Sequence, residues 1–165
     1  MPNNAEHELR ILEEIERNPE TTQATLAAQL GVAVGSINFV IKRLVNKGYV
    51  HVKQLQRRRL KYIITPKGLA LRSKLAKDSL QYSMRLYRET RATARQFIAE
   101  VERRGGDQLA IRGDSELAEV VALTCLEMNI AIRPEQANLP VIVIVDTSLQ
   151  LEWPESITST ARTYQ

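Results

Sequence analysis

Residues 66–104 constrain the fold of this chain more than any other segment. Pro66 fits the first turn of a helix, and neither glycine nor proline occurs from Leu69 to Arg104. Basic residues at positions 103 and 104 complement the dipole at a helix C-terminus, and the two glycines that follow end the helix. A helix of this length is too long to be buried within a small domain. We therefore predict a long connecting helix, with a separate module on each side of it.

Two short helices are predicted near the start of the chain. Apolar residues recur at helical spacing over residues 6–17. The Asn18-Pro19 step ends this helix, because the residue before a proline avoids the helical conformation. Thr22 can cap a second helix through its side-chain oxygen, and Gly31 can end it as a left-handed residue.

A third helix and a hairpin are predicted next. The helix follows the connection at residues 31–34 and runs to Lys47. Its apolar residues form one stripe, which consists of Ile37, Val40, Ile41 and Leu44. Residues 49–55 alternate as a strand does, residues 60–65 are again rich in strand-forming types, and residues 56–59 form a basic tip. This order of elements is that of a winged helix, in which the third helix enters the DNA major groove and the hairpin touches the backbone or minor groove.

The charge of this region supports the same interpretation. Residues 36–65 contain eight Lys or Arg and no Asp or Glu. A surface that approaches phosphates gains from lacking carboxylates, and each basic residue that neutralises a phosphate releases counterions. We therefore predict double-stranded DNA as the partner; the alternative is a basic face that is merely solvated.

Periodicity separates the outward residues of the third helix from its apolar stripe. Asn38 can pair with the edge of an adenine, and an exposed Phe39 can touch a thymine methyl, although Phe39 packed under the hairpin is the alternative. Lys42, Arg43 and Lys47 are expected to bind phosphates. The complete predicted DNA-binding set is Val34, Gly35, Ser36, Asn38, Phe39, Lys42, Arg43, Lys47, Arg57, Arg58 and Arg59.

The long helix carries a seam with the alternating four- and three-residue spacing of a coiled coil. Helix-turn-helix proteins usually bind paired half-sites, so we predict a homodimer through this seam. Its positions are Leu80, Met84, Tyr87, Arg91, Ala94, Ile98 and Val101, with Arg91 and Ala94 as the weak points. The alternative is that the helix packs on the C-terminal region of its own chain.

Residues 105–165 differ in charge from the rest, with three basic and nine acidic residues. Residues 108–112, 116–128 and 130–132 predict a strand, a helix and a strand, and VIVIVD predicts a third strand behind this βαβ unit. The sequence GDSELA stands where a dinucleotide-binding fold has G-x-G-x-x-G or A.

The GDSELA loop departs from the dinucleotide-binding pattern at the positions that would lie next to a pyrophosphate. Gly113 and Ala118 fit the pattern, but Ser115 replaces the glycine that lets a pyrophosphate approach. Asp114 and Glu116 add negative charge where an anion would sit. We predict a structural or protein-contact role for a half-Rossmann-like module, with no cofactor; the alternative is nucleotide or metabolite sensing, or an enzyme-like module.

Several other function classes find no support in the sequence. The single Cys125 cannot form an intramolecular disulfide. It is predicted to be a buried thiol on the apolar helix face that also carries Leu117 and Val121. The only histidines, His7 and His51, are not spaced with Cys125 as the ligands of a structural metal site are. Catalytic pairs are not evident, so we do not expect an enzyme. The N-terminus lacks the regions of a signal peptide, and no apolar run is long enough to span a bilayer. We therefore expect a cytoplasmic protein.

A family resemblance covers roughly residues 5–68. The run LAAQLGVAVGSINFVIKRLVNKGYV, the basic hairpin and ITPKG resemble the winged-helix domains of MarR-type transcriptional regulators. LGVAVGSINF followed by KGYV is similar to a small subgroup associated with exopolysaccharide gene clusters. Ala33 stands where the family commonly has a Ser or Thr that caps the recognition helix. The resemblance implies a sequence-specific transcriptional regulator.

Together these observations predict an α+β protein with four parts. Residues 1–65 form a winged helix-turn-helix domain, residues 66–104 the connecting and dimerisation helix, residues 105–153 the degenerate βαβ module, and residues 154–165 a flexible tail. An effector that binds the βαβ module could be a protein or a small molecule, and the sequence does not distinguish the two.

Overall fold

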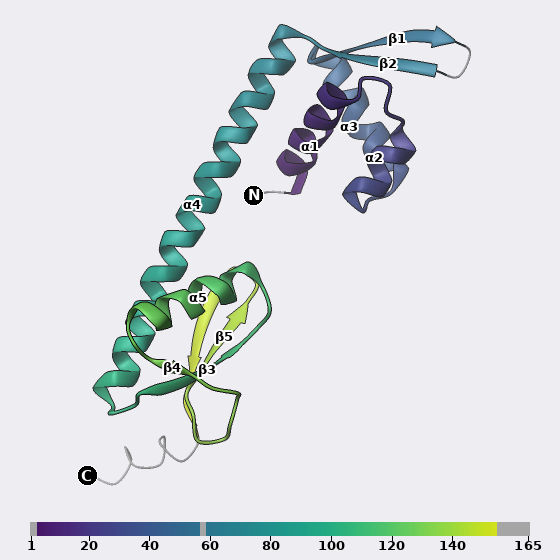
Figure 1. Ribbon diagram of the computed structural model, residues 1–165. Helices are drawn as coiled ribbons and strands as arrows, with labels where there is room; N and C mark the ends of the chain where they lie inside the picture. The colour runs from purple at the N-terminus through teal and green to yellow at the C-terminus, as the bar shows by residue number, and fades with distance from the viewer. Residues whose placement is uncertain (1–2, 57–58, 155–165) are drawn as a thin grey trace, which may run out of the picture. The chain divides into compact units, whose positions relative to one another are not determined.

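The computed structural model describes residues 3–56 and 59–154, and the predicted tail lies almost entirely outside them. The chain forms two compact units, residues 1–82 and residues 83–165, whose boundary falls within the long helix. The fold is α+β, with an N-terminal winged helix-turn-helix, the long helix and a small C-terminal module (Figure 1).

The first unit begins with α1 (Asn3–Arg17), α2 (Gln23–Leu30) and α3 (Val34–Asn46). The local signals at α2 are confirmed. Thr22 caps this helix by accepting a hydrogen bond from the backbone N–H of Thr25 at 3.1 Å, and Gly31 ends it with φ of 65°. Ala33 precedes α3 with no side-chain cap.

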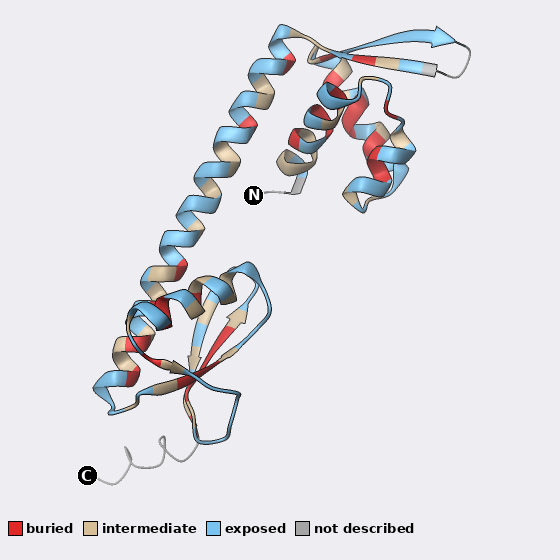
Figure 2. Cartoon of the chain, in the orientation of Figure 1, coloured by how far each residue is buried: buried red, intermediate tan, exposed pale blue. Residues whose placement is uncertain are grey.

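The core of the first unit lies between the apolar faces of its helices. The predicted stripe of α3 is confirmed, because all four of its residues are buried. Leu12 and Ile15 of α1 and Leu26 of α2 complete the packing, each at most 1% exposed (Figure 2). This core fixes which face of α3 remains in solvent.

The hairpin consists of β1 (Val50–Gln56) and β2 (Arg59–Ile64), which pair antiparallel. Val50 is buried, whereas the rest of β1 is exposed, so the hairpin extends from the core as a wing. Arg57 and Arg58 lie outside the described residues, as does the side chain of Arg59.

Helix α4 (Pro66–Arg103) starts directly at the base of the wing. The Thr65 hydroxyl donates to the carbonyl of Gly48 at 2.7 Å and accepts from the backbone N–H of Gly68 at 3.0 Å. Thr65 therefore both caps α4 and connects it to the C-terminal end of α3.

The second unit contains a four-stranded sheet in the order β4-β3-β5-β6. Its elements are β3 (Gln108–Arg112), α5 (Glu116–Glu127), β4 (Ala131–Ile132), β5 (Val141–Val145) and β6 (Ser148–Glu152). Strand β3 runs parallel to both β4 and β5, as the βαβ prediction requires, and β6 runs antiparallel to β5. Strand β6 is an addition to the predicted elements, although SLQLE alternates as a strand does.

The C-terminal part of the predicted seam needs correction. Ala94, Ile98 and Val101 are each 0% exposed within the chain itself. They pack with Leu109 and Ile142 of the sheet and with Val121 and Cys125 of α5. The alternative interpretation, packing on the chain's own C-terminal region, is right for these three residues, because the sheet must bury its apolar face.

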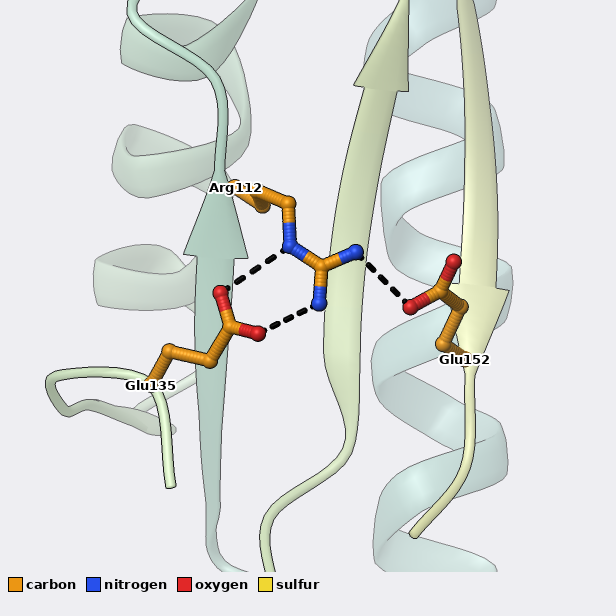
Figure 3. Close-up of polar contacts among 3 residues, drawn as sticks. All are labelled: Arg112, Glu135 and Glu152. Atoms are coloured by element: carbon orange, nitrogen blue, oxygen red, sulfur yellow. Dashed lines mark hydrogen bonds and ion pairs between the residues drawn. The ribbon is translucent and has the colours of Figure 1, made fainter. Parts of the chain in front are cut away.

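The opposite face of the sheet is covered by an ion-pair cluster. Arg112 Nε donates to Glu135 at 3.0 Å, and Arg112 Nη1 donates to Glu152 at 2.9 Å (Figure 3). The guanidinium is exposed and lies in front of β5, on the side away from the helices. Val141 and Val143 of β5 are buried. Hydrogen bonding to Arg112 lowers the pKa of the Glu135 carboxyl.

Candidate nucleic-acid interface

The solvent face of α3 carries most of the predicted DNA-binding residues. Asn38 and Arg43 are half-buried. Phe39 is 64% exposed, which does not fit the alternative of a ring packed under the wing. The exposed members of the set are Val34, Gly35, Ser36, Phe39, Lys42 and Lys47.

Arg43 is held by an acidic residue of another helix. Its Nη2 lies 2.7 Å from Oε1 of Glu8 on α1, and the two side chains are only 26% and 16% exposed. The guanidinium carbon lies 5.7 Å from the centre of the Phe39 ring. Glu8 is absent from the predicted site, and no sequence signal identifies it, because the pair joins two helices through the tertiary fold.

The wing carries two basic side chains directly opposite one another. Lys53 of β1 is in register with Lys61 of β2. Like charges at such positions are destabilising, and neither lysine forms an ion pair with a carboxylate in the described ranges. A polyanion would remove this repulsion, so both lysines join the candidate interface.

Lys67 contacts the C-terminal end of α3. Its Nζ donates to the carbonyl of Lys47 at 3.2 Å and lies 5.1 Å from the centre of the Tyr49 ring. A cation at a helix C-terminus offsets the partial negative charge of the last carbonyls. Lys67 therefore stabilises the junction between α3 and the wing.

Within residues 3–56 and 59–154, no group of His, Cys, Asp and Glu is placed to hold a metal ion. No single helix there has both the length and the apolar character to cross a membrane; α2 and α3 meet that test only as a pair bent by 114°. Cys125 is buried, and burial raises the pKa of its thiol to about 11.

The GDSELA loop lies between β3 and α5. Gly113 has φ of 134°, and a Cβ there would lie 3.1 Å from Ile144. Ser115 precedes α5 but makes no side-chain cap, and Glu116 and Glu119 occupy the first turn. Two carboxylates at this terminus compete with any anion for the helix dipole.

Comparisons with known proteins agree with the geometry of the first unit. Residues 5–51 match the family described as winged helix-turn-helix DNA-binding. This match spans α1 to the start of β1. No curated protein matches the chain.

Several solved structures resemble part of the chain at low sequence identity. PcaV from Streptomyces coelicolor is 19% identical, covering 59% of this chain and 74% of that chain, with a TM-score of 0.47. The Mycobacterium tuberculosis MarR family protein Rv2887, in complex with salicylic acid, is 25% identical, covering 59% and 74%, with a TM-score of 0.44. Streptococcus pneumoniae FabT, in complex with DNA, is 22% identical, covering 47% and 55%, with a TM-score of 0.38.

Proposed function

We propose that this protein is a sequence-specific, DNA-binding transcriptional regulator of the MarR type that acts as a homodimer in the cytoplasm. The observation that carries the proposal is the basic segment of α3 and the wing, residues 36–65, which contains no Asp or Glu and forms part of a winged helix-turn-helix. Such a surface fits the major groove with α3 and the flanking backbone with the wing.

The residues of this surface divide into two roles. Asn38 and Phe39 are proposed to read base edges in the major groove. Lys42, Lys47 and the wing arginines at positions 57–59 are proposed to bind phosphates, which orient the protein without specifying sequence. The exposed backbone at Gly35 supports this arrangement, because a Cβ there would meet nothing within 4 Å and α3 can lie close to DNA.

The proposed dimer uses the part of the α4 seam that the chain leaves open. Leu80, Met84 and Tyr87 are 64%, 51% and 40% exposed and follow one another at four- and three-residue spacing. Large apolar side chains in a row on an exposed helix are suited to pairing with the same row of a second copy. A dimer would present two recognition helices to paired half-sites.

The regulated genes are proposed from the resemblance of LGVAVGSINF and KGYV to the exopolysaccharide subgroup. The second unit is proposed to contact a protein or a small-molecule effector rather than to catalyse a reaction. The competing proposal is a metabolite-sensing regulator that uses the GDSELA loop. A rise in melting temperature with millimolar NAD, NADH or a nucleotide sugar would favour that competitor.

Selection from random duplexes, followed by mapping of genomic occupancy, tests the proposed function. We expect one enriched motif with two related half-sites and enrichment of that motif upstream of genes for polysaccharide synthesis. Binding that is equally strong on every duplex would contradict sequence-specific regulation. Enrichment of a single motif upstream of other genes would support sequence-specific regulation and would contradict only the proposed exopolysaccharide target.

A further inference from the structure

The environment of Arg43 differs from that of its neighbour Lys42. Lys42 is exposed, whereas Arg43 is half-buried and ion-paired with Glu8 at 2.7 Å. The Nε atom of Arg43 is buried without a hydrogen-bond partner in the described structure. Leaving such a donor unsatisfied costs free energy, so the compensating contacts with Glu8 and Phe39 hold this conformation.

Phe39 lies one helical turn before Arg43, where the two side chains share a face of α3. The Arg43 guanidinium carbon is 5.7 Å from the ring centre, within the range of a cation–π contact. An exposed ring on a helix would otherwise exchange between rotamers. The contact with a fixed guanidinium restricts that exchange and keeps the ring in one orientation at the DNA-facing surface.

We propose that Glu8 is a positioning residue for base recognition: it fixes Arg43, and Arg43 holds the Phe39 ring against a thymine methyl group. This inference rests on the proposed DNA-binding function. Its chemical consequence is that Arg43 makes no phosphate contact, because Glu8 already neutralises its charge. Glu8 therefore influences which base is bound without touching DNA.

The first test measures phosphate contacts in the full-length protein. Binding to the selected duplex is followed over a range of salt concentrations for Lys42→Met and Arg43→Met. Removing one phosphate contact reduces the slope of log K against log salt by about 0.9. We expect that reduction for Lys42→Met and an unchanged slope for Arg43→Met. An equal reduction for both variants would show that Arg43 leaves Glu8 for a phosphate and would overturn the proposal.

The second test removes the methyl group alone. Each thymine of the site is replaced in turn by uracil, and one replacement is expected to weaken wild-type binding about fourfold, the value of one buried methyl group. Phe39→Ser, Arg43→Met and Glu8→Gln should each lose this preference. Phe39 is exposed, so Phe39→Ser removes the proposed apolar contact with the base without disturbing the core.

Glu13→Gln is the matched control, because Glu13 is an exposed acid on the same helix and the change in net charge is identical. It should keep the wild-type preference for thymine. Equal behaviour of Glu8→Gln and Glu13→Gln, or a retained preference in Phe39→Ser, would overturn the positioning role. A wild-type protein that binds all duplexes equally would instead refute the proposed function on which the inference rests.

Discussion

Gly68 in α4 faces the backbone carbonyl oxygen of Tyr49 so closely that a Cβ added at Gly68 would overlap that oxygen. Thr65 reinforces the same junction by hydrogen bonding to Gly48 and to Gly68. The end of α3, the base of the wing and the start of α4 are thereby joined at one point. We expect the placement of the wing relative to α3 to depend on this contact.

Gly68→Ala should therefore destabilise the protein. The added methyl group would overlap the Tyr49 carbonyl and approach Ile64, and overpacking of this kind costs about 1–3 kcal/mol. Urea denaturation would measure the change in the free energy of unfolding. Gly35→Ala is the control, since its methyl group meets nothing within 4 Å and should leave stability unchanged or slightly higher.

The wing and the recognition helix should respond differently to substitution. Replacing Arg57, Arg58 and Arg59 with Ala should weaken binding to every duplex and reduce the salt slope by about 0.9 for each phosphate that the wing no longer neutralises. Asn38→Ala should cost roughly 1–3 kcal/mol on the selected site and leave nonspecific binding almost unchanged. Equal losses on specific and random DNA for both variants would contradict the division of roles.

Lys53→Gln should raise stability while weakening DNA binding. The substitution removes the repulsion with Lys61 across the wing, a pair effect of about 0.2–1 kcal/mol. Thermal melts at low salt should show the gain, and it should shrink at high salt because the repulsion is screened. A variant that melts below wild type at low salt would show that the two ammonium groups do not repel.

Met84 and Ile98 lie on one seam by their spacing in the sequence, but the structure separates their roles. Met84→Glu should dissociate a dimer and leave the fold intact, because Met84 is 51% exposed. Ile98→Glu should instead unfold the second unit, because Ile98 is 0% exposed and the carboxylate of the new glutamate would be buried without a partner. Sedimentation and circular dichroism distinguish the two outcomes. A wild-type protein that sediments as a monomer at micromolar concentration would contradict the dimer.

The buried thiol should make stability depend on pH in the alkaline range. Desolvation raises the pKa of Cys125 from 9.0 to about 11, so between these values the unfolded chain loses a proton that the folded chain keeps. The contribution of the protonated thiol to the free energy of unfolding is fully present below pH 9 and is lost as the pH rises through 11. The free energy of unfolding then falls by up to about 1.4 kcal/mol per pH unit. Cys125→Ala should show a shallower decline than wild type in this range.

Local chemistry in the sequence determined much of the first unit. Thr22 caps α2 because its side-chain oxygen accepts a hydrogen bond from a free backbone N–H of the first turn. Gly31 ends α2 because a residue without a Cβ adopts the left-handed conformation readily. The apolar stripe of α3 determined which side of that helix enters the core. Periodicity also predicted that Lys42 faces solvent, since a helix with one buried face must present the other, but it left Phe39 open between exposure and packing under the wing.

Only the tertiary structure decided which apolar and charged residues acquired partners within the chain. Met84 and Ile98 follow the same spacing in the sequence, yet one is exposed and the other is covered by the sheet, because that sheet is formed by residues far along the chain. Arg43 and Lys42 are neighbours of equal charge, and only Arg43 meets Glu8. Spacing within one helix specifies a face, but contacts between distant segments specify what covers that face.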